Sequence, residues 1–311
     1  MILIVNLNLA VDHIVEVDEL RAGAVQRSRG ARQQAGGKGV NVARVLKTLG
    51  EPALLLGFCG GQAGDLIAAG LRAEQIASDA TRIREESRTC LIINDRGRRE
   101  QTVINGPGAI VRDAERRDFE ATYTRQLPRA ALVVIDGSLP PNLSAETYAR
   151  LTSEANAAGR RVLLDCAGVP LGRALAARPF LVKINAVEAA ELSGLHVTDF
   201  PSATHAARSL RDKGAENVMI TLGEQGALLD FAGALYRFVA PQVRAVNSVG
   251  SGDAALAGLA AALRRNLTAA EAGALAVAAG AANALHGAGG CSREEIEELR
   301  PRVRLQVEES P

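Results

Sequence analysis

Two glycine-rich segments carry the residues of this chain that are best suited to chemistry on an anionic ligand. The first, AGGKGVN at 35–41, opens a helical pattern. Glycines let the backbone approach a ligand closely, and the N-terminus of a helix offers unpaired N–H groups to an anion. Lys38 adds positive charge, and Asn41 can present an amide to hydroxyl groups. The alternative is a plain turn, since Arg32 and Val40 break the pattern of a Walker A loop.

The second segment, NSVGSGD at 247–253, precedes an alanine-rich helical pattern. Gly250, Ser251 and Gly252 supply consecutive backbone N–H groups, which form an anion-stabilising nest. Asp253 stands at the start of the helix, where it is either a catalytic carboxylate or only an N-cap. The two segments together favour a catalytic role over a purely structural one, because one helix start carries a cation and an amide and the other carries a carboxylate. This combination predicts a site that binds a substrate at one segment and stabilises transferring phosphoryl charge at the other.

Two other signals are weaker. The segment GFCGGQAG at 57–64 favours a structural turn over a dinucleotide site, because Cys59 takes the second glycine position of GxGxxG. The four histidines show no metal-ligand spacing, so zinc chemistry has no support. A nicotinamide-dependent dehydrogenase is therefore the poorer alternative to phosphoryl transfer.

The elements that must position these residues alternate regularly. Short apolar runs of the kind found in strands buried on both faces are separated by amphipathic helical patterns. The strand-like runs are residues 1–9, 53–57, 131–136, 161–166, 180–184 and 217–222. This alternation predicts one α/β domain over 1–311, with a mostly parallel sheet flanked by helices on both faces. In such sheets ligands bind beyond the carboxyl ends of the strands.

Two regions interrupt this alternation, at 11–35 and 88–105. Both contain alternating and charged residues, with turn signals at Gly23 and at Asp95-Arg96-Gly97. We expect them to form a few antiparallel strands outside the main sheet, as a small β-strand lid.

Charge and composition exclude several classes of partner. Lys and Arg number 36 against 35 Asp and Glu, a net charge of +1, which argues against nucleic acid and anionic membranes.

The four cysteines are far apart without a CxxC, as expected for reduced thiols in the cytoplasm. The N-terminal segment lacks a basic region and is predicted to be a strand rather than a signal peptide. The alanine-rich stretch 269–285 contains Glu271 and Asn283 and is predicted to be a buried helix, not a membrane span.

The segments AGGKGVNVARVLKTLG and NSVGSGDAALAGL resemble the two signatures of the PfkB (ribokinase-like) carbohydrate kinase family. Further pieces follow in the family's order along nearly the whole chain: LNLAVD, ESRTCLII, NGPG, GSLPP, LLDCAG, KINAVEAAELSG and TLGEQGAL. The lysine of GGKG and the NGPG segment are similar to the branch that contains 1-phosphofructokinase and tagatose-6-phosphate kinase. The resemblance implies a ribokinase-like fold, an ATP-dependent kinase with ATP and Mg²⁺ as cofactors, and a homodimer through the lid strands.

The resemblance also implies residue roles. Asp253 matches the family's catalytic base, and Gly250, Ser251 and Gly252 match its anion hole. Expected substrate-binding residues are Asp12, Arg27, Gly36, Gly37, Lys38, Asn41, Arg88 and Ser138. Expected ATP-binding residues are Lys183, Asn185, Thr221, Gly223, Gly226, Ser248 and Asn283, and Asn185 with Glu188 forms the NxxE pattern linked to magnesium through water. For Asp12 and Arg88 an ordinary surface pair is the alternative.

The expected substrate follows from charge. Lys38, Arg88 and Arg27 are more cations than a neutral sugar needs, so we expect a phosphorylated ketohexose, with fructose 1-phosphate preferred and tagatose 6-phosphate or fructose 6-phosphate as alternatives. Asp253 would accept the proton of the sugar hydroxyl, and a helix N-terminus is expected to keep it ionised. A non-catalytic sensor of sugar phosphate and nucleotide is the alternative of a different class, and the intact GSGD argues against it.

The chain departs from the family's usual residues at a few positions: Leu9, Ile184, Asn247 and Ser248. Leu9 and Ile184 replace prolines, and Asn247-Ser248 replaces Asp-Thr on the nucleotide side. None of these changes removes the acid, the nest or the NxxE pattern.

Overall fold

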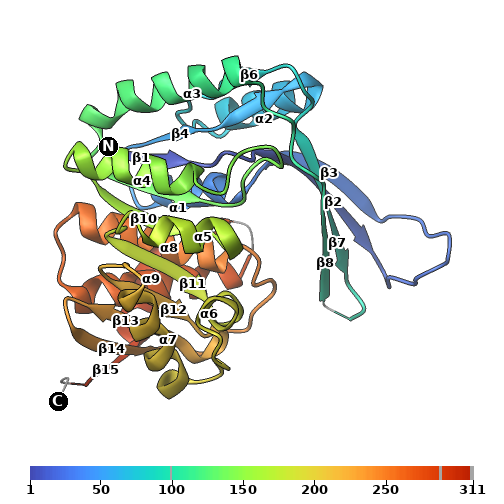
Figure 1. The fold of residues 1–311 in the computed structure, drawn as a ribbon. Coiled ribbons are helices and arrows are strands. Elements are labelled where there is room, and N and C mark those ends of the chain that lie inside the picture. Colours follow the sequence, from blue (N-terminus) through green and yellow to red (C-terminus); the bar gives the residue numbers. More distant parts are fainter. Residues whose placement is uncertain (99, 287–288, 309–311) are drawn as a thin grey trace.

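The computed structural model describes residues 1–98, 100–286 and 289–308. In this part of the chain the central sheet has nine strands, in the order β15-β14-β13-β12-β11-β10-β9-β1-β4 (Figure 1). The strands that pair in parallel are β1 (Ile2–Val5), β4 (Ala53–Leu56), β9 (Leu132–Asp136), β10 (Arg161–Asp165), β11 (Leu181–Asn185) and β12 (Val218–Thr221). All six coincide with predicted runs. The antiparallel extension consists of β13 (Gly226–Phe231), β14 (Ala234–Val239) and β15 (Arg304–Glu308).

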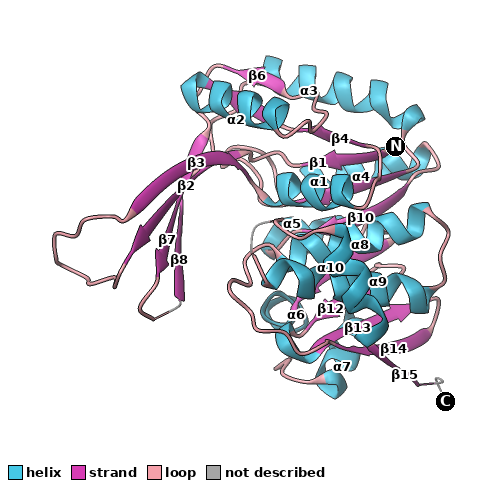
Figure 2. Cartoon of the chain, turned by 180° about the vertical axis from the view of Figure 1, so that it is seen from behind, coloured by secondary structure: helices cyan, strands magenta, loops and turns pink. Residues whose placement is uncertain are grey.

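Helices cover both faces of the sheet, as predicted (Figure 2). Alternate residues of β1 belong to two separate cores, with Ile2 and Ile4 in one and Leu3 and Val5 in the other. Because successive side chains of a strand point to opposite faces, each face buries its own apolar cluster. One face packs against α1 (Lys38–Thr48), α2 (Gly61–Ala73), α8 (Ser251–Arg264), α9 (Ala269–Ala284) and α10 (Arg293–Leu299). The other packs against α3 (Asp113–Gln126), α4 (Thr147–Ala157), α5 (Gly168–Leu175), α6 (Ala186–Ser193) and α7 (Phe200–Asp212).

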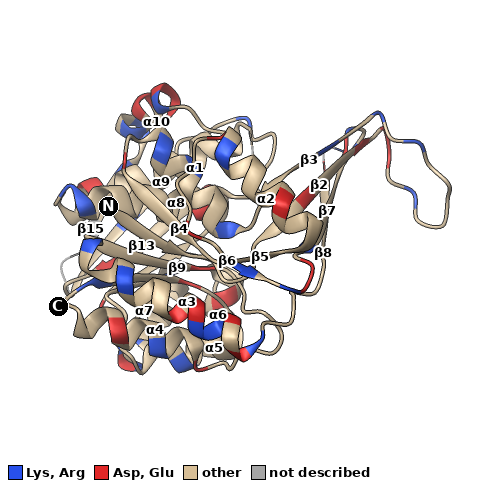
Figure 3. Cartoon of the chain, turned by 90° about the horizontal axis from the view of Figure 1, so that it is seen from above, with Lys and Arg blue, Asp and Glu red and all other residues tan. Residues whose placement is uncertain are grey.

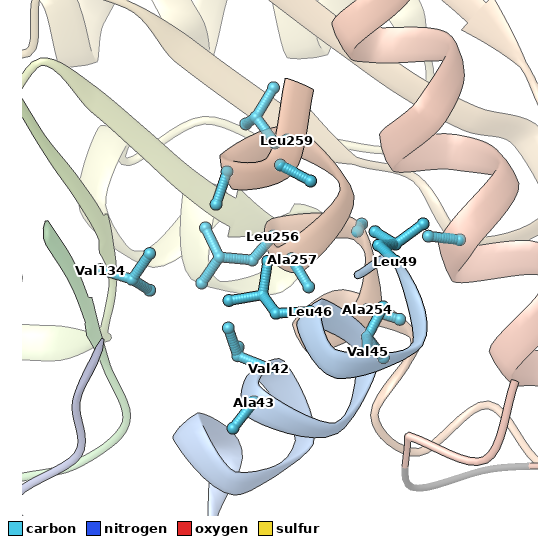
Figure 4. Close-up of a cluster of buried hydrophobic side chains, with 14 of the residues drawn as sticks. Val42, Ala43, Val45, Leu46, Leu49, Val134, Ala254, Leu256, Ala257 and Leu259 are labelled. Atoms are coloured by element: carbon cyan, nitrogen blue, oxygen red, sulfur yellow. The ribbon is translucent and has the colours of Figure 1, made fainter. Parts of the chain in front are cut away.

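Helices α1 and α8 pack directly against each other (Figure 4). Val42 and Leu46 of α1 lie beside Leu256 and Ala257 of α8, and all four are buried. The alanines of α8 leave little side-chain bulk, so neighbouring helices approach closely. At Gly258 a Cβ would lie 2.8 Å from the carbonyl oxygen of Leu275 in α9. This packing brings the starts of α1 and α8, which are far apart in the sequence, to one place.

The lid is a separate four-stranded sheet that projects from the body (Figures 1 and 2). Its order is β3-β2-β7-β8, formed by β2 (Ala10–Val17), β3 (Gly30–Gly36), β7 (Arg88–Asp95) and β8 (Glu100–Asn105). The prediction of a purely antiparallel lid is wrong in one respect, because β2 and β7 pair in parallel, with Ala10 opposite Arg88. Both strands start at the body of the protein and run outward, so they share a direction.

The glycine-rich segment 57–64 forms a structural connection, as favoured above. It contains β5 (Phe58–Gly60), which pairs with β6 (Thr81–Ile83), and the first residues of α2. The carboxylate of Glu86 accepts hydrogen bonds from the backbone N–H groups of Gln62 (3.2 Å) and Ala63 (2.5 Å). The N–H groups at the N-terminus of α2 are therefore already bound by the carboxylate of Glu86.

No helix in the described ranges combines the length and the apolar character needed to cross a membrane. The alanine-rich stretch forms α9, and it is packed in the core as predicted. Figure 3 shows basic and acidic residues interspersed along the outer helices, in keeping with the balanced composition.

Candidate active site

The two glycine-rich helix starts meet through Asn41 and Asp253. Asn41, in the first turn of α1, donates a hydrogen bond from Nδ2 to Oδ2 of Asp253, in the first turn of α8, at 2.9 Å. Both side chains are buried, at 7% and 6% exposure. Gly250 is the N-cap residue of α8 with φ 81°, a left-handed conformation that glycine adopts without steric cost. The fold thus joins the carboxylate of one segment to the amide of the other.

The glycines of the first segment have packing roles at this site. Gly37 has φ 112°, and a Cβ there would lie 2.5 Å from Oδ1 of Asn6. A Cβ on Gly36 would overlap the carboxylate of Asp12. The two residues are neighbours because β3, which ends at Gly36, pairs with β2, which carries Asp12. Glycine at 36 and 37 is therefore needed to let the buried side chains of Asn6 and Asp12 stand against the start of α1.

Two further carboxylates, to which the sequence analysis gave no role, complete the centre. Asp136 and Asp165 end the neighbouring strands β9 and β10 and lie opposite each other in the parallel register. Oxygen atoms of Asp136, Asp165 and Asp253 all lie within 4.8 Å of one another, and all three side chains are buried. Each of the first two ends an apolar strand at the edge where α/β sheets bind ligands, and this was the signal that could have found them.

Two lysines face this acidic cluster. Lys38 Nζ lies 3.1 Å from Oδ1 of Asp165 and 3.9 Å from Oε1 of Glu188. Lys183, on β11 and only 3% exposed, forms an ion pair with the other oxygen of Asp165. A Cβ at Gly252 would lie 2.9 Å from Lys183 Nζ, so glycine at this position leaves room for the ammonium group.

Asp136 is the carboxylate that this arrangement leaves unpaired. Among the described residues neither of its oxygens has a hydrogen-bond partner, and its side chain is fully buried. Burial raises the pKa of Asp136 well above its ordinary value, the charges of Asp165 and Asp253 raise it further, and Lys38 and Lys183 oppose the shift. Three acids against two ammonium groups leave one negative charge in excess, and a proton on Asp136 removes it.

The pKa values of the other two acids diverge. Burial raises the pKa of Asp165, but Lys183 and Lys38 outweigh it and bring the pKa below its usual value. The pKa of Asp253 is raised, mainly by burial and also by Asp165, against Lys38, Lys183 and the Asn41 hydrogen bond. The helix N-terminus favours the ionised form of Asp253, but the loss of hydration in the buried centre is the larger effect, so the pKa is raised and Asp253 is a stronger base than its position at a helix start suggests.

The substrate-side residues lie at the root of the lid. Asp12, on β2, is 8% exposed, and burial raises its pKa to about 6 against the opposing charges of Arg44 and Arg88. Arg88 Nε donates to the backbone oxygen of Asn8 at 3.2 Å, and Asn8 Nδ2 donates to Ser138 Oγ at 3.0 Å. Because Asp12 is buried, the alternative of an ordinary surface pair with Arg88 does not describe it.

Arg27 lies elsewhere. It belongs to the exposed loop between β2 and β3, which Figures 1 and 2 show at the end of the lid away from the main sheet. The fold of a single chain does not bring Arg27 beside Lys38 and Arg88.

The NxxE pattern at the end of β11 forms a capping box. Asn185 Oδ1 accepts from the Glu188 backbone N–H at 2.9 Å, and Glu188 Oε2 accepts from the Asn185 backbone N–H at 3.0 Å. This pair explains why α6 begins here. It leaves Glu188 Oε1 outside the cap and directed toward Lys38.

The remaining nucleotide-side residues divide into surface and buried positions. Thr221 Oγ1 donates to the Ile184 backbone oxygen at 3.4 Å, and Gly223 and Gly226 have φ of 61° and 115° in the turn after β12. Ser248 is exposed in the loop before α8.

Asn283 is fully buried beneath that loop. Its Nδ2 donates to the Val249 oxygen (2.9 Å) and to Ser251 Oγ (3.2 Å), and its Oδ1 accepts from the Gly289 N–H (2.6 Å). The amide of Asn283 is thus occupied in holding the loop that precedes Asp253.

The parallel sheet, the projecting lid and the paired helix starts define the class of sugar kinases with the ribokinase-like fold. The family described as pfkB family carbohydrate kinase matches residues 2–295, and the chain belongs to this family. It is therefore an ATP-dependent carbohydrate kinase.

Two relatives and one solved structure match this chain over most of its length. The 1-phosphofructokinase of Bacillus subtilis (strain 168) is 33% identical over 305 residues, which cover 98% of this chain and 99% of that protein. The 1-phosphofructokinase of Xanthomonas campestris pv. campestris is 39% identical over 272 residues, covering 85% and 84%. The crystal structure of phosphofructokinase-2 from Escherichia coli in complex with fructose-6-phosphate has a TM-score of 0.88 at 26% identity, covering 97% and 98%.

Proposed function

We propose that this kinase transfers the γ-phosphoryl group of ATP to the C6 hydroxyl of fructose 1-phosphate, giving fructose 1,6-bisphosphate and ADP. The observation that carries the proposal is the hydrogen bond between Asn41 and Asp253, which joins the two glycine-rich helix starts and supports a role for this buried carboxylate beside the sugar. The names of the two relatives support fructose 1-phosphate as the acceptor. Tagatose 6-phosphate and fructose 6-phosphate are the alternative substrates, the latter supported by the Escherichia coli complex.

The sugar would bind between the lid root and the start of α1. Arg88 and Lys38 would supply positive charge for the phosphate. One guanidinium group can donate two parallel hydrogen bonds to two oxygens of the same phosphate. Asp12 and Asn41 would accept and donate hydrogen bonds to the sugar hydroxyls, beside the backbone of Gly36 and Gly37. Ser138, which Asn8 holds at 3.0 Å, lies at the same edge of the sheet.

Asp253 would act as the general base. It accepts the proton of the C6 hydroxyl as the oxygen bonds to the γ-phosphorus and the bond from that phosphorus to the β,γ-bridging oxygen breaks, which releases ADP. The transition state is loose, so alignment and charge neutralisation matter more than base strength. The N–H groups of the 250–252 nest would stabilise the developing charge. A raised pKa makes Asp253 a better proton acceptor than an exposed aspartate.

ATP would lie along the carboxyl ends of β11 and β12, in contact with Asn185, Thr221, Gly223, Gly226 and Ser248. Lys183 and Asn283, both almost fully buried, would support this surface from below rather than cover the nucleotide. Glu188 is suited to hold Mg²⁺ through water, because its Oε1 lies outside the capping pair and carboxylate oxygens are preferred by this ion. When bound, Mg²⁺ neutralises charge on the ATP phosphates.

We further propose that the chain works as one kinase domain in a homodimer that pairs the lids. The outer strand β8 is largely exposed, with Ile104 at 55%, and such an edge is usually covered. A dimer of this kind is also the arrangement in which Arg27 of one lid could reach the other subunit's substrate. The four cysteines are buried and free, which supports a cytoplasmic location.

The test is an ADP-release assay across a panel of sugar phosphates and free sugars. Fructose 1-phosphate is expected to give the highest kcat/KM, and the product should be identified as the 1,6-bisphosphate. A higher value with fructose or ribose would contradict the phosphate-binding role of Lys38 and Arg88. No ADP release with any sugar, together with tight sugar-phosphate binding, would instead establish the sensor. Light scattering that gives a monomeric mass at micromolar concentration would contradict the dimer.

A further inference from the structure

We propose that this protein has a second anion site, a groove that binds a small molecule with more than one phosphate group. The groove lies at the amino ends of β10 and β11, beside the ends of α4 and α5, and has a volume of about 580 Å³. The groove is shallow and open to solvent, so an anion there would be held by charge rather than by enclosure. The active site lies at the opposite, carboxyl ends of the same strands.

The charge of the groove is strongly positive. Arg160, Arg161 and Arg178 line it, against the single acid Glu216. Arg178 Nη2 lies 4.0 Å from Glu216 Oε1, at the limit of an ion pair, and its side chain is 74% exposed. On a chain with a net charge of only +1, three arginines and one glutamate among the lining residues form a local excess of positive charge. Guanidinium groups offer paired N–H donors that match the oxygens of phosphate.

The arginines are anchored but keep donors to spare. Arg160 Nη2 donates to the Pro128 oxygen at 3.1 Å, while its enclosed Nε has no hydrogen-bond partner in the described chain. Arg161 Nη2 donates to the Leu263 oxygen at 3.2 Å, and its guanidinium lies 5.1 Å from the centre of the Phe180 ring. Each guanidinium carries five N–H donors, so these contacts use only a part of them.

The alternative is that the arginines only neutralise the negative ends of α4 and α5. The carbonyl groups after α5 already have a donor, because Asn156 Nδ2 bonds to the oxygens of Ala177 (2.8 Å) and Arg178 (3.2 Å). Helix neutralisation therefore accounts poorly for three arginines around one groove.

The groove is separate from the catalytic centre. Arg161 is the first residue of β10 and Asp165 is the last. Four residue steps along a strand span about 13 Å. An anion in the groove would therefore bind without displacing substrate or nucleotide.

The test uses pyrophosphate as the probe in calorimetric titrations of the full chain, with a non-hydrolysable ATP analogue present to occupy the nucleotide site. Wild type is expected to bind one pyrophosphate per chain. The double variant Arg160→Gln/Arg178→Gln should bind at least tenfold more weakly. Arg173→Gln is the matched control, because Arg173 is exposed on α5, pairs with Glu146 at 3.2 Å and does not line the groove; its affinity should stay within twofold.

All variants should keep the wild-type kcat, because none of the changed residues belongs to the catalytic centre. If the double variant does not fold, the single variant Arg178→Gln is tested instead, and it is expected to bind pyrophosphate at least threefold more weakly than wild type. Absence of pyrophosphate binding to wild type would overturn the proposal. So would a groove variant that melts at a lower temperature but binds pyrophosphate unchanged, since that result assigns the arginines to the helix ends.

Discussion

Asn41 and Asp253 are 212 positions apart in the sequence, yet the Asn41 amide donates directly to the Asp253 carboxylate at 2.9 Å. The bond occupies Oδ2 and leaves Oδ1 of Asp253 for the acceptor hydroxyl. It also favours the ionised form of Asp253 and so opposes the rise in pKa that burial causes. In the proposed mechanism, Asn41 would therefore couple substrate binding to proton removal by Asp253.

Replacement of Asn41 tests this coupling. Asn41→Leu should lower kcat by about tenfold, the effect of losing one hydrogen bond to a charged group. Because the pKa of Asp253 would then rise further, the acidic limb of the kcat–pH profile should move to higher pH. Asn41→Ser, which keeps a donor, should lie between the variant and wild type. An unchanged pH profile in Asn41→Leu would show that the bond does not orient or tune the base.

Arg88 is predicted to bind the substrate phosphate. Charge-assisted contacts contribute roughly 1.5–3 kcal/mol, so Arg88→Ala should reduce kcat/KM for the sugar phosphate by about tenfold or more. Activity with a free sugar should change little, because the lost contact is to the phosphate. Arg84→Ala, an exposed arginine near the same strand, serves as the control. An equal loss with free and phosphorylated sugars would indicate a structural role for Arg88.

The pKa of Asp12, raised to about 6, predicts a pH effect on substrate binding. Asp12 accepts hydrogen bonds from sugar hydroxyls best when ionised, so KM should rise as the pH falls below about 6. Asp12→Asn should flatten this limb. For stability the sign is opposite: a carboxyl whose folded pKa is raised stabilises the fold at low pH, and this contribution is lost as the pH rises through 6. Melting curves of wild type and Asp12→Asn between pH 4 and pH 8, as an approximate range, would measure it.

Asp136→Asn should stabilise the protein. The buried carboxyl has no hydrogen-bond partner and a pKa held well above normal, so the folded state binds its proton more tightly than the unfolded state. Stability is then lost as the pH rises, and an amide of the same shape removes this loss. At neutral pH the variant is expected to be more stable than wild type, because the amide carries no charge to bury and takes up no proton on folding. The gain should vanish at low pH, and a destabilised variant at pH 8 (about the upper end of the titration) would contradict the account.

The sequence was informative where chemistry and local pattern coincide. The apolar runs predicted the parallel strands, and glycine-rich helix starts identified the two segments that meet at Asp253. Asp136 and Asp165 each end a predicted apolar run, which marks them as candidates, but their proximity to each other arises from the register of β9 and β10, which the sequence pattern does not specify. The parallel pairing of β2 and β7 was missed for the same reason.

The direction of the pKa shift of Asp253 could not be read from its position at a helix start. That position favours the ionised form, but the shift depends on burial and on Asp165, Lys38 and Lys183, which reach the site from other strands and from α1. The distance of Arg27 from its own active site likewise depends on the length and direction of the lid.

The most direct test of the central claim is the variant Asp253→Asn, studied by thermal melting and steady-state kinetics. Asparagine has the size of aspartate, and its amide oxygen can still accept the hydrogen bond from Asn41, so the melting temperature should stay close to that of wild type. The N-cap alternative for Asp253 is wrong, because the N-cap residue of α8 is Gly250 and no side chain among the described residues caps this helix. Loss of the general base should lower kcat by about 10²–10⁴-fold, or about 2.7–5.4 kcal/mol of transition-state stabilisation, with little change in ATP affinity. A kcat within about threefold of wild type, at an unchanged melting temperature, would contradict the account and leave Asp253 with a structural role only, as the partner of Asn41.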